Sequence, residues 1–374
     1  MDRRPTVTRS FIISAARSAV VPRGGAFSHL SIQDLAKPII LECLNRSEVP
    51  AEGIDEIIVG NALGAGGNPA RLISLAAGLG EQIGGLTIDR QCCSGLDAII
   101  LADAMIKSGQ ARIVIAGGVE SYSRRPLRAQ TFADGRPARP YDRPAFTPWP
   151  DRDPEMADAA DQLAINFGIS REEQDAWAVA SHQKAASSQA RLTAEIVPVE
   201  RVAIDAFTRN LSEKTCMRAT PITGSITPAN SSVAADAAAF CVVASEDVAK
   251  ALQTQGTEII AGRTIGGQPE CPGIAPVAAI QKVLSEGNLR PNEMHVCEVM
   301  EAYAAQAIAC VSQAGLDRDR TNLGGGSLAR GHPIGASGAI NAVRLYHELK
   351  HTGGNGIAAI AAAGGLGTAL LLRA

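Results

Sequence analysis

Cys92 lies in the segment 89–96, between a short apolar run and an alanine-rich stretch with helical spacing. A thiol at such a junction sits near a helix N-terminus, where the helix dipole and free backbone N–H groups favour the thiolate. A thiolate so placed can be the nucleophile of an acyl transfer, with neighbouring N–H groups holding the oxyanion. The alternative is a small buried apolar residue, and the adjacent Cys93 leaves that alternative open.

His332 is the second candidate, in the glycine-rich segment 324–338. It lies between Gly331 and Pro333 in a loop that leads into a predicted helix. Because the proline restricts the loop backbone, we expect the imidazole ring to be held in a fixed position. A histidine in this position can accept a proton from a thiol. The alternative is a glycine-rich turn with an incidental histidine.

Two other kinds of motif carry less weight. The glycine-rich segments 61–71 and 364–367 match neither a dinucleotide-binding nor a P-loop pattern, which disfavours a nucleotide-fold dehydrogenase. Glu120, Glu298 and Glu301 could be paired acids, but glutamates beside strands are more often hydrogen-bond anchors. We therefore predict buried anchors at these three positions.

The elements that must position Cys92 and His332 alternate between strands and helices. Strands are predicted at 11–15, 56–60, 86–88 and 112–117, with helices at 31–43, 70–79 and 95–108. The alternation resumes with strands at 240–244, 258–261, 296–299, 356–361 and 367–372, and with helices at 246–254, 275–286, 302–314 and 336–350. This order predicts an α/β fold whose sheet is covered by helices on both faces, in two halves that look alike.

A loop-rich stretch separates the two halves. Residues 122–155 contain seven prolines and no sustained periodicity, and helical patterning returns over 156–190, with Ser170 as a helix N-cap. We interpret 119–236 as an inserted domain that could cover a substrate.

Composition excludes several classes of protein. Of the 374 residues, 35 are Lys or Arg and 38 are Asp or Glu, and this balance argues against nucleic-acid binding. The eight cysteines form no CxxC pair, so no metal site is predicted. Residues 1–5 lack the apolar start of a secretory leader, and the uncharged run 353–372 fits strand–turn–strand better than a membrane span. We expect a cytoplasmic chain with reduced thiols.

Taken together, these segments resemble the thiolase family. The stretch around Cys92 (90–96) is similar to the family's acylated-cysteine motif, and 331–338 is similar to the motif of its catalytic histidine. Further similar segments are 67–71, 116–121 and 194–199. The resemblance implies that Cys92 is acylated, that His332 is the base, and that the backbone at Cys92 and Gly364 forms an oxyanion hole.

The resemblance also implies a fold and partners. The fold would be two duplicated α/β halves in a five-layered αβαβα arrangement: 1–118 with 237–256, then 257–374, with the inserted loop domain 119–236 covering coenzyme A. A coenzyme A thioester would be a substrate, with no permanently bound cofactor. The chain would form a homodimer or homotetramer, or join a hetero-complex. For coenzyme A we single out Lys214, Arg218 and Ser232, because basic side chains suit its phosphates.

Three departures from the family pattern fall in the expected substrate pocket. Met300 stands where thiolases carry the Asn of Asn-Glu-Ala-Phe, and Ala361 stands where they carry a second, proton-abstracting cysteine. Pro272 replaces a usual methionine. Because methionine donates no proton and alanine is no base, ordinary carbon–carbon chemistry would be impaired. Core packing is the expected role of Cys93, Cys271 and Cys297, which could otherwise substitute for the missing thiol.

We therefore expect an acyl-CoA acyltransferase of altered chemistry. It would load an acyl group onto Cys92, with His332 as base, and pass it to an unknown acceptor, either an activated carbon or a heteroatom nucleophile. One alternative is a conventional acetyl-CoA C-acyltransferase (β-ketothiolase) with substituted acid/base groups. The other is a catalytically silent acyl-CoA-binding partner subunit.

Overall fold

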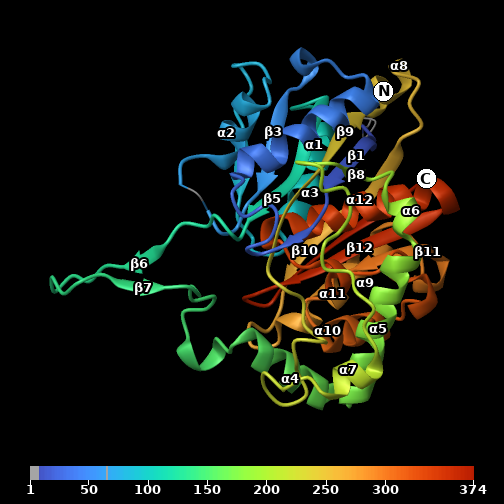
Figure 1. The fold of residues 1–374 in the computed structure, drawn as a ribbon. Coiled ribbons are helices and arrows are strands. Elements are labelled where there is room, and N and C mark those ends of the chain that lie inside the picture. Colours follow the sequence, from blue (N-terminus) through green and yellow to red (C-terminus); the bar gives the residue numbers. More distant parts are fainter. Residues whose placement is uncertain (1–7, 65) are drawn as a thin grey trace, which may run out of the picture.

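The computed structural model describes residues 8–64 and 66–374 (Figure 1). Residues 1–5, which were predicted to lack the apolar start of a secretory leader, lie outside these described residues. The strands are β1 (Ser10–Ser18), β2 (Val21–Pro22), β3 (Glu56–Gly60), β4 (Leu86–Ile88), β5 (Ile113–Ser121), β6 (Arg128–Gln130), β7 (Arg139–Tyr141), β8 (Ile196–Val197), β9 (Ala235–Ser245), β10 (Thr257–Gly266), β11 (Met294–Val299), β12 (Asn355–Ala362) and β13 (Leu366–Arg373).

The α-helices are α1 (Ile32–Ser47), α2 (Pro69–Ala76), α3 (Ser94–Lys107), α4 (Met156–Phe167), α5 (Arg171–Ser187), α6 (Gln189–Leu192), α7 (Glu213–Met217), α8 (Glu246–Ala251), α9 (Pro276–Glu286), α10 (Ala304–Gln313), α11 (Ser327–Arg330) and α12 (Ile334–Thr352). α1, α2, α3, α8, α9, α10 and α12 coincide with predicted helices to within a few residues at each end, the predicted helical stretch 156–190 is divided into α4, α5 and α6, and α7 and α11 were not predicted. The Ser170 hydroxyl accepts a hydrogen bond from Glu173 N at 3.1 Å, so the predicted N-cap of α5 is confirmed. None of the described helices combines the length and apolar character that a membrane crossing requires.

The strands repeat one topology in the two halves. One half runs β4-β3-β5-β9-β1 and the other β11-β12-β13-β10, joined where β1 pairs with β10. In each half a parallel pair (β3 with β5, β11 with β12) is followed by two antiparallel pairings. The predicted similarity of the halves is therefore present in strand order and direction.

Strand side chains divide the apolar interior into three cores. In β9 the odd-numbered residues from Ala235 to Val243 face a central core, and the even-numbered residues from Ala238 to Ala244 face an outer one. In β12, Ala358 and Ile360 likewise face the central core, whereas Ile357 and Ala359 face the opposite outer core. Because successive strand residues point to opposite faces, both halves of the sheet are buried on both sides.

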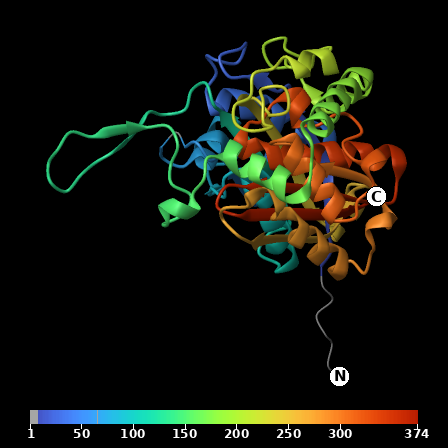
Figure 2. The ribbon, with the colours of Figure 1, turned by 90° about the horizontal axis from the view of Figure 1, so that it is seen from below.

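Helices complete the layers. α3 and α12 pack against each other and against both halves of the sheet in the central layer, α1 and α2 cover the outer face of one half, and α9 covers the outer face of the other (Figures 1 and 2). The arrangement is the predicted five-layered αβαβα fold. It places the N-terminal ends of α3 and α12 close together, because the two helices share the middle layer.

The long connection from β5 to β9 contains α4–α7 and a two-stranded hairpin, β6–β7, which extends away from the rest of the molecule (Figures 1 and 2). α4 packs against α10, and α5 packs against α10 and α11, so this connection covers the end of the C-terminal half. The domain limits 118/119 and 236/237 stay a prediction.

Candidate active site

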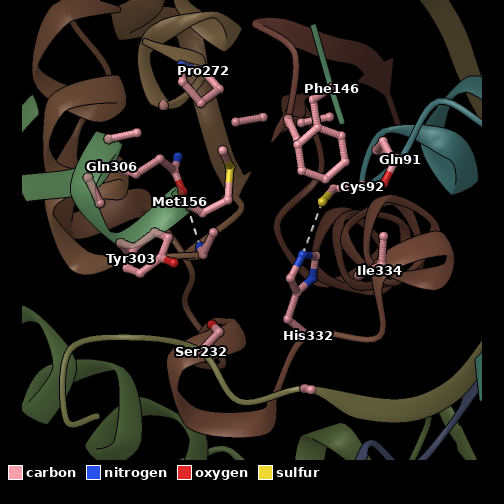
Figure 3. Close-up of a pocket in the computed structure, with 18 of the residues that line it drawn as sticks. Gln91, Cys92, Phe146, Met156, Ser232, Pro272, Tyr303, Gln306, His332 and Ile334 are labelled. Carbon is pink, nitrogen blue, oxygen red and sulfur yellow. Dashed lines mark hydrogen bonds between the residues drawn. The ribbon is translucent and has the colours of Figure 1, made fainter. Parts of the chain in front are cut away.

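A cavity of about 290 Å³ opens at the N-terminal ends of α3 and α12 (Figure 3). Its walls come from both halves of the molecule and from the long β5–β9 connection. The lining residues are Gln91, Cys92, Tyr122, Phe146, Met156, Ala159, Ala160, Ser232, Ala234, Pro272, Gly273, Ala302, Tyr303, Gln306, His332, Ile334, Ala361, Ala362 and Ala363. The structure thus brings Cys92 and His332 together, as predicted.

Cys92 is presented by a tight turn between β4 and α3. Gln91 adopts a left-handed backbone conformation (φ 50°), and the Ser94 hydroxyl donates to Gln91 O at 2.6 Å while accepting from Arg90 N at 2.8 Å. These bonds fix the turn just before the helix, so the sulfur of Cys92 faces the cavity. The side chain of Cys93 turns the other way, into the core, with its sulfur 3.6 Å from Ile360 O.

The hydrogen bonds of His332 define which ring nitrogen is the base. Ser337 Oγ donates its only proton to Pro333 O at 3.0 Å, and His332 Nδ1 lies 2.6 Å from the same oxygen. With its proton on Pro333 O, Ser337 Oγ accepts from Nδ1–H, and we assign the tautomer that leaves the lone pair on Nε2. Nε2 lies 3.2 Å from Cys92 Sγ, so it can take the thiol proton (Figure 3).

The two helices that carry this pair approach without side chains between them. A Cβ on Gly95 of α3 would come within 2.7 Å of Gly335 O in α12, and a Cβ on Gly338 would come within 2.7 Å of Leu96 N. Glycine is required at both positions because any larger residue would push the helices apart. The 3.2 Å separation of sulfur and imidazole depends on this close contact.

Burial keeps both members of the pair neutral. Desolvation raises the pKa of Cys92 to about 12, and desolvation lowers the pKa of His332 to about 4. Between these values the resting pair is a thiol and an uncharged imidazole. The proton then moves from sulfur to Nε2 as the sulfur attacks.

Glu120 anchors the loop that holds His332. Its carboxylate accepts bonds from Ala62 N and Gly335 N, both at 3.0 Å, and from Asn61 Nδ2 at 2.8 Å. Burial raises its pKa to about 7, against the effect of these N–H donors. Glu120 thus ties the end of β3 to the start of α12, which is the predicted anchoring role.

The other two glutamates differ from each other. Glu301 accepts from Trp177 Nε1 at 3.0 Å, Ser181 Oγ at 2.8 Å and Asn322 Nδ2 at 2.8 Å, so it also anchors. Glu298 makes no hydrogen bond to any described residue. Its oxygens lie 3.6–3.8 Å from the guanidinium groups of Arg344 and Arg330, a buried ionic contact.

Backbone donors face the sulfur of Cys92, although not both of those expected. The N–H groups of Cys92 and Ala363 each lower the pKa of the thiol, which places them at the sulfur. Gly364, the predicted second donor, is not among the residues that line the cavity. The N–H of Ala363, in the turn after β12, faces the thiol, and an oxyanion donor at Gly364 stays a prediction.

Two of the three predicted pocket residues line the cavity, and one does not. Ala361 and Pro272 are lining residues, whereas Met300 is 1% exposed and lies outside the lining. Met300 directly follows β11 and, like Val296 of that strand, packs into the central core, where its sulfur accepts a bond from Ser327 Oγ at 3.3 Å. Assigning Met300 to the substrate pocket was wrong because strand alternation turns its side chain inward.

The residues predicted for coenzyme A are dispersed. Ser232 lines the cavity, where its hydroxyl donates to Glu301 O at 2.5 Å. Lys214 lies in α7 and Arg218 caps its C-terminal end; both are exposed, and neither lines the cavity.

Sequence reasoning did not single out several large lining residues, among them Phe146, Met156, Tyr303 and Gln306. Met156 and Gln306 lie on predicted helices, and the helical period could have indicated that they face inward. Phe146 lies in the proline-rich stretch without periodicity, where no signal was available. Tyr303 lies within the predicted helix 302–314, whereas in the structure it is the extended residue directly before α10.

Comparisons with known proteins cover nearly the whole chain. Family models described as "Thiolase, N-terminal domain" and "Thiolase, C-terminal domain" match residues 10–247 and 250–374. YhfS of Bacillus subtilis, provisionally named an acetyl-CoA C-acetyltransferase, is 37% identical over 97% of this chain and 98% of its own.

Solved structures agree. A crystal structure of the Bacillus anthracis acetyl-CoA acetyltransferase is 32% identical, with a TM-score of 0.92 over 98% of this chain and 99% of that one. Human mitochondrial 3-ketoacyl-CoA thiolase, solved in complex with CoA, is 29% identical, with a TM-score of 0.92 over 98% of each chain.

Proposed function

The chain belongs to the thiolase family of acyltransferases, and from this premise we propose that it carries an acyl group from a coenzyme A thioester on Cys92, with His332 as the base. The observation that supports this most directly is the 3.2 Å contact between His332 Nε2 and Cys92 Sγ inside the cavity.

The loading step uses groups that already lie in place. Cys92 Sγ attacks the thioester carbonyl as its proton passes to His332 Nε2. The N–H groups of Cys92 and Ala363 hold the developing oxyanion. Collapse of the tetrahedral intermediate breaks the bond to the coenzyme A sulfur, which takes the proton back from Nε2. The products are acyl-Cys92 and free coenzyme A.

The acceptor step has fewer acid/base groups available. Ala361 offers no proton, and among the described residues Cys92 is the only cysteine that lines the cavity. Cys93 and Cys297 are fully buried in the cores, and Cys271 lies outside the lining. We infer that the acyl group passes to an acceptor that needs little help to become a nucleophile, either an activated carbon or a heteroatom.

Mass spectrometry of the intact protein after incubation with acetyl-CoA tests the loading step. We expect a mass increment of one acetyl group, with release of coenzyme A, that disappears in Cys92→Ala. Cys271→Ala is the matched control, because this half-exposed thiol lies outside the cavity lining, and it should still be labelled. A folded protein that gains no acetyl group would refute the proposal and favour a silent acyl-CoA-binding subunit.

A second candidate is a conventional acetyl-CoA C-acetyltransferase. The 32% identical acetyl-CoA acetyltransferase of Bacillus anthracis favours it. Carbon–carbon condensation of two acetyl-CoA molecules at a rate comparable with that of acetyl-Cys92 formation would support this candidate over the first.

A further inference from the structure

Tyr303 brings a free hydroxyl into the cavity from the side opposite the Cys92–His332 pair. Figure 3 shows its ring among the lining residues, with the hydroxyl directed toward the interior of the cavity and His332 across from it. Two other polar side chains there are engaged: Ser232 Oγ donates to Glu301 O, and Gln306 Oε1 accepts from Ala302 N at 3.1 Å. Among the described residues, none forms a hydrogen bond with the Tyr303 hydroxyl.

The backbone holds Tyr303 rigidly. Residues 302–304 pair with 230–232: Ser232 N donates to Ala302 O and Ala304 N donates to Asn230 O, both at 2.9 Å. Tyr303 is the extended residue directly before α10 (φ −138°, ψ 148°). A donor fixed in this way needs no reorganisation when charge develops opposite it.

The hydroxyl stays protonated. Burial is the main cause that raises the pKa of Tyr303 to about 12, and electrostatic repulsion of the phenolate by Cys92, Glu155 and Asp158 adds to it. The phenol is therefore a hydrogen-bond donor at neutral pH and not a base.

We propose that the Tyr303 hydroxyl donates a hydrogen bond to the carbonyl oxygen of the acyl acceptor, which would be a carbon acid with a ketone or thioester carbonyl next to the reacting carbon. This inference rests on the proposed function and names the acceptor class for the same site. The bond stabilises the enolate form of the acceptor. The side chains of Met300 and Ala361 cannot do this, since the first lies in the core and the second has no polar atom.

Transfer of the acyl group from Cys92 to the carbon acid needs no base other than His332. His332 Nε2 takes the proton from the reacting carbon, and the resulting enolate, held by Tyr303, attacks the carbonyl of acyl-Cys92. The new carbon–carbon bond forms, the carbon–sulfur bond breaks, and Cys92 sulfur takes the proton back from Nε2. In reverse, acetoacetyl-CoA and the Cys92 thiol give acetyl-Cys92 and acetyl-CoA.

Two routes to the same acetyl-Cys92 provide the test. From acetyl-CoA the leaving group is the coenzyme A thiolate, whereas from acetoacetyl-CoA it is the enolate of acetyl-CoA. Rapid-quench mass spectrometry measures both rates in wild type and in Tyr303→Phe, with the exposed Tyr141→Phe as control. We expect Tyr303→Phe to slow the acetoacetyl-CoA route by ~10²–10³-fold and to slow the acetyl-CoA route far less.

Each other result overturns the inference in a recognisable way. Equal slowing of both routes would show that Tyr303 only supports the shape of the cavity, and no slowing would show that the hydroxyl is not used. Wild type that reacts with acetyl-CoA but not with acetoacetyl-CoA would exclude the acceptor class while leaving the proposed function intact. Wild type that forms no acetyl-Cys92 from acetyl-CoA would refute the proposed function itself.

Discussion

Removing the Ser337 hydroxyl should prevent His332 Nε2 from accepting the Cys92 proton, while the imidazole ring stays in place. Ser337 Oγ is the only group within hydrogen-bond distance of His332 Nδ1 among the described residues, at 2.6 Å. In Ser337→Ala a proton on Nδ1 would be buried without an acceptor. The imidazole would instead place its proton on Nε2, facing Cys92, where it cannot accept another.

The size of the effect follows from the lost bond. Leaving a buried donor unsatisfied costs about 1–3 kcal/mol, and about 1.4 kcal/mol corresponds to a tenfold change in rate. We therefore expect Ser337→Ala to slow formation of acetyl-Cys92 from acetyl-CoA by about 5- to 150-fold. The fold should tolerate the change, because residue 337 lies within α12 between Ala336 and Gly338.

Rapid-quench mass spectrometry of acetylation, alongside the thermal unfolding midpoint, measures this. Ser187→Ala is the matched control, since that serine is exposed on α5 and bonds only to Lys184 O. The reasoning would be refuted if Ser337→Ala acetylated within twofold of wild type while His332→Ala did not react, because the base would then not depend on the hydroxyl for its tautomer.

Three further outcomes are expected. Alkylation of Cys92 by iodoacetamide should accelerate about tenfold per pH unit from pH 6 to 9, because its pKa is about 12; a flat profile would mean that a thiolate–imidazolium pair already exists. In Glu120→Gln, an amide NH₂ would face backbone N–H donors, so urea unfolding should report a loss of about 1–3 kcal/mol, and an unchanged midpoint would contradict the anchoring role. Because the folded-state pKa of Glu120 is raised to about 7, wild-type stability should fall as pH rises from 4.5 through 7, and this component should be absent in the Gln variant. Ala361→Cys should return a thiol to the cavity and raise condensation of two acetyl-CoA molecules by ~10²–10⁴-fold, whereas no gain would show that thiol chemistry at this position is not limiting.

The sequence predicted the central elements well because their signals are local. The runs around Ile57, Ile115 and Val242 are continuous and apolar, as expected for strands buried on both faces. Cys92 and His332 could be predicted because each stands at a junction that leads into a helix, Cys92 three residues before Gly95 and His332 directly after Gly331. Their 3.2 Å contact depends on how the two halves pack, which no local pattern encodes.

The errors also have a physical origin. Met300 was placed in the pocket from a motif, but the direction of its side chain is set by strand alternation and by the core that receives it. The N–H of Ala363, in the turn after β12, faces the Cys92 thiol and was not predicted, and an oxyanion donor at Gly364 stays a prediction. Phe146 comes from a segment without periodicity. The oligomeric state, the cytoplasmic location and the domain limits stay predictions.

The shared middle layer has a consequence for how the molecule can be divided. The nucleophile belongs to the part of the chain before β10 and the base to the part after it, and their helices meet backbone to backbone at Gly95 and Gly335. A break introduced in the turn between α8 and β10 would leave one reactive group on each fragment. The alkylation rate of Cys92 would then report re-association of the fragments. The Cys92–His332 pair could therefore be used to measure assembly of two separately produced fragments.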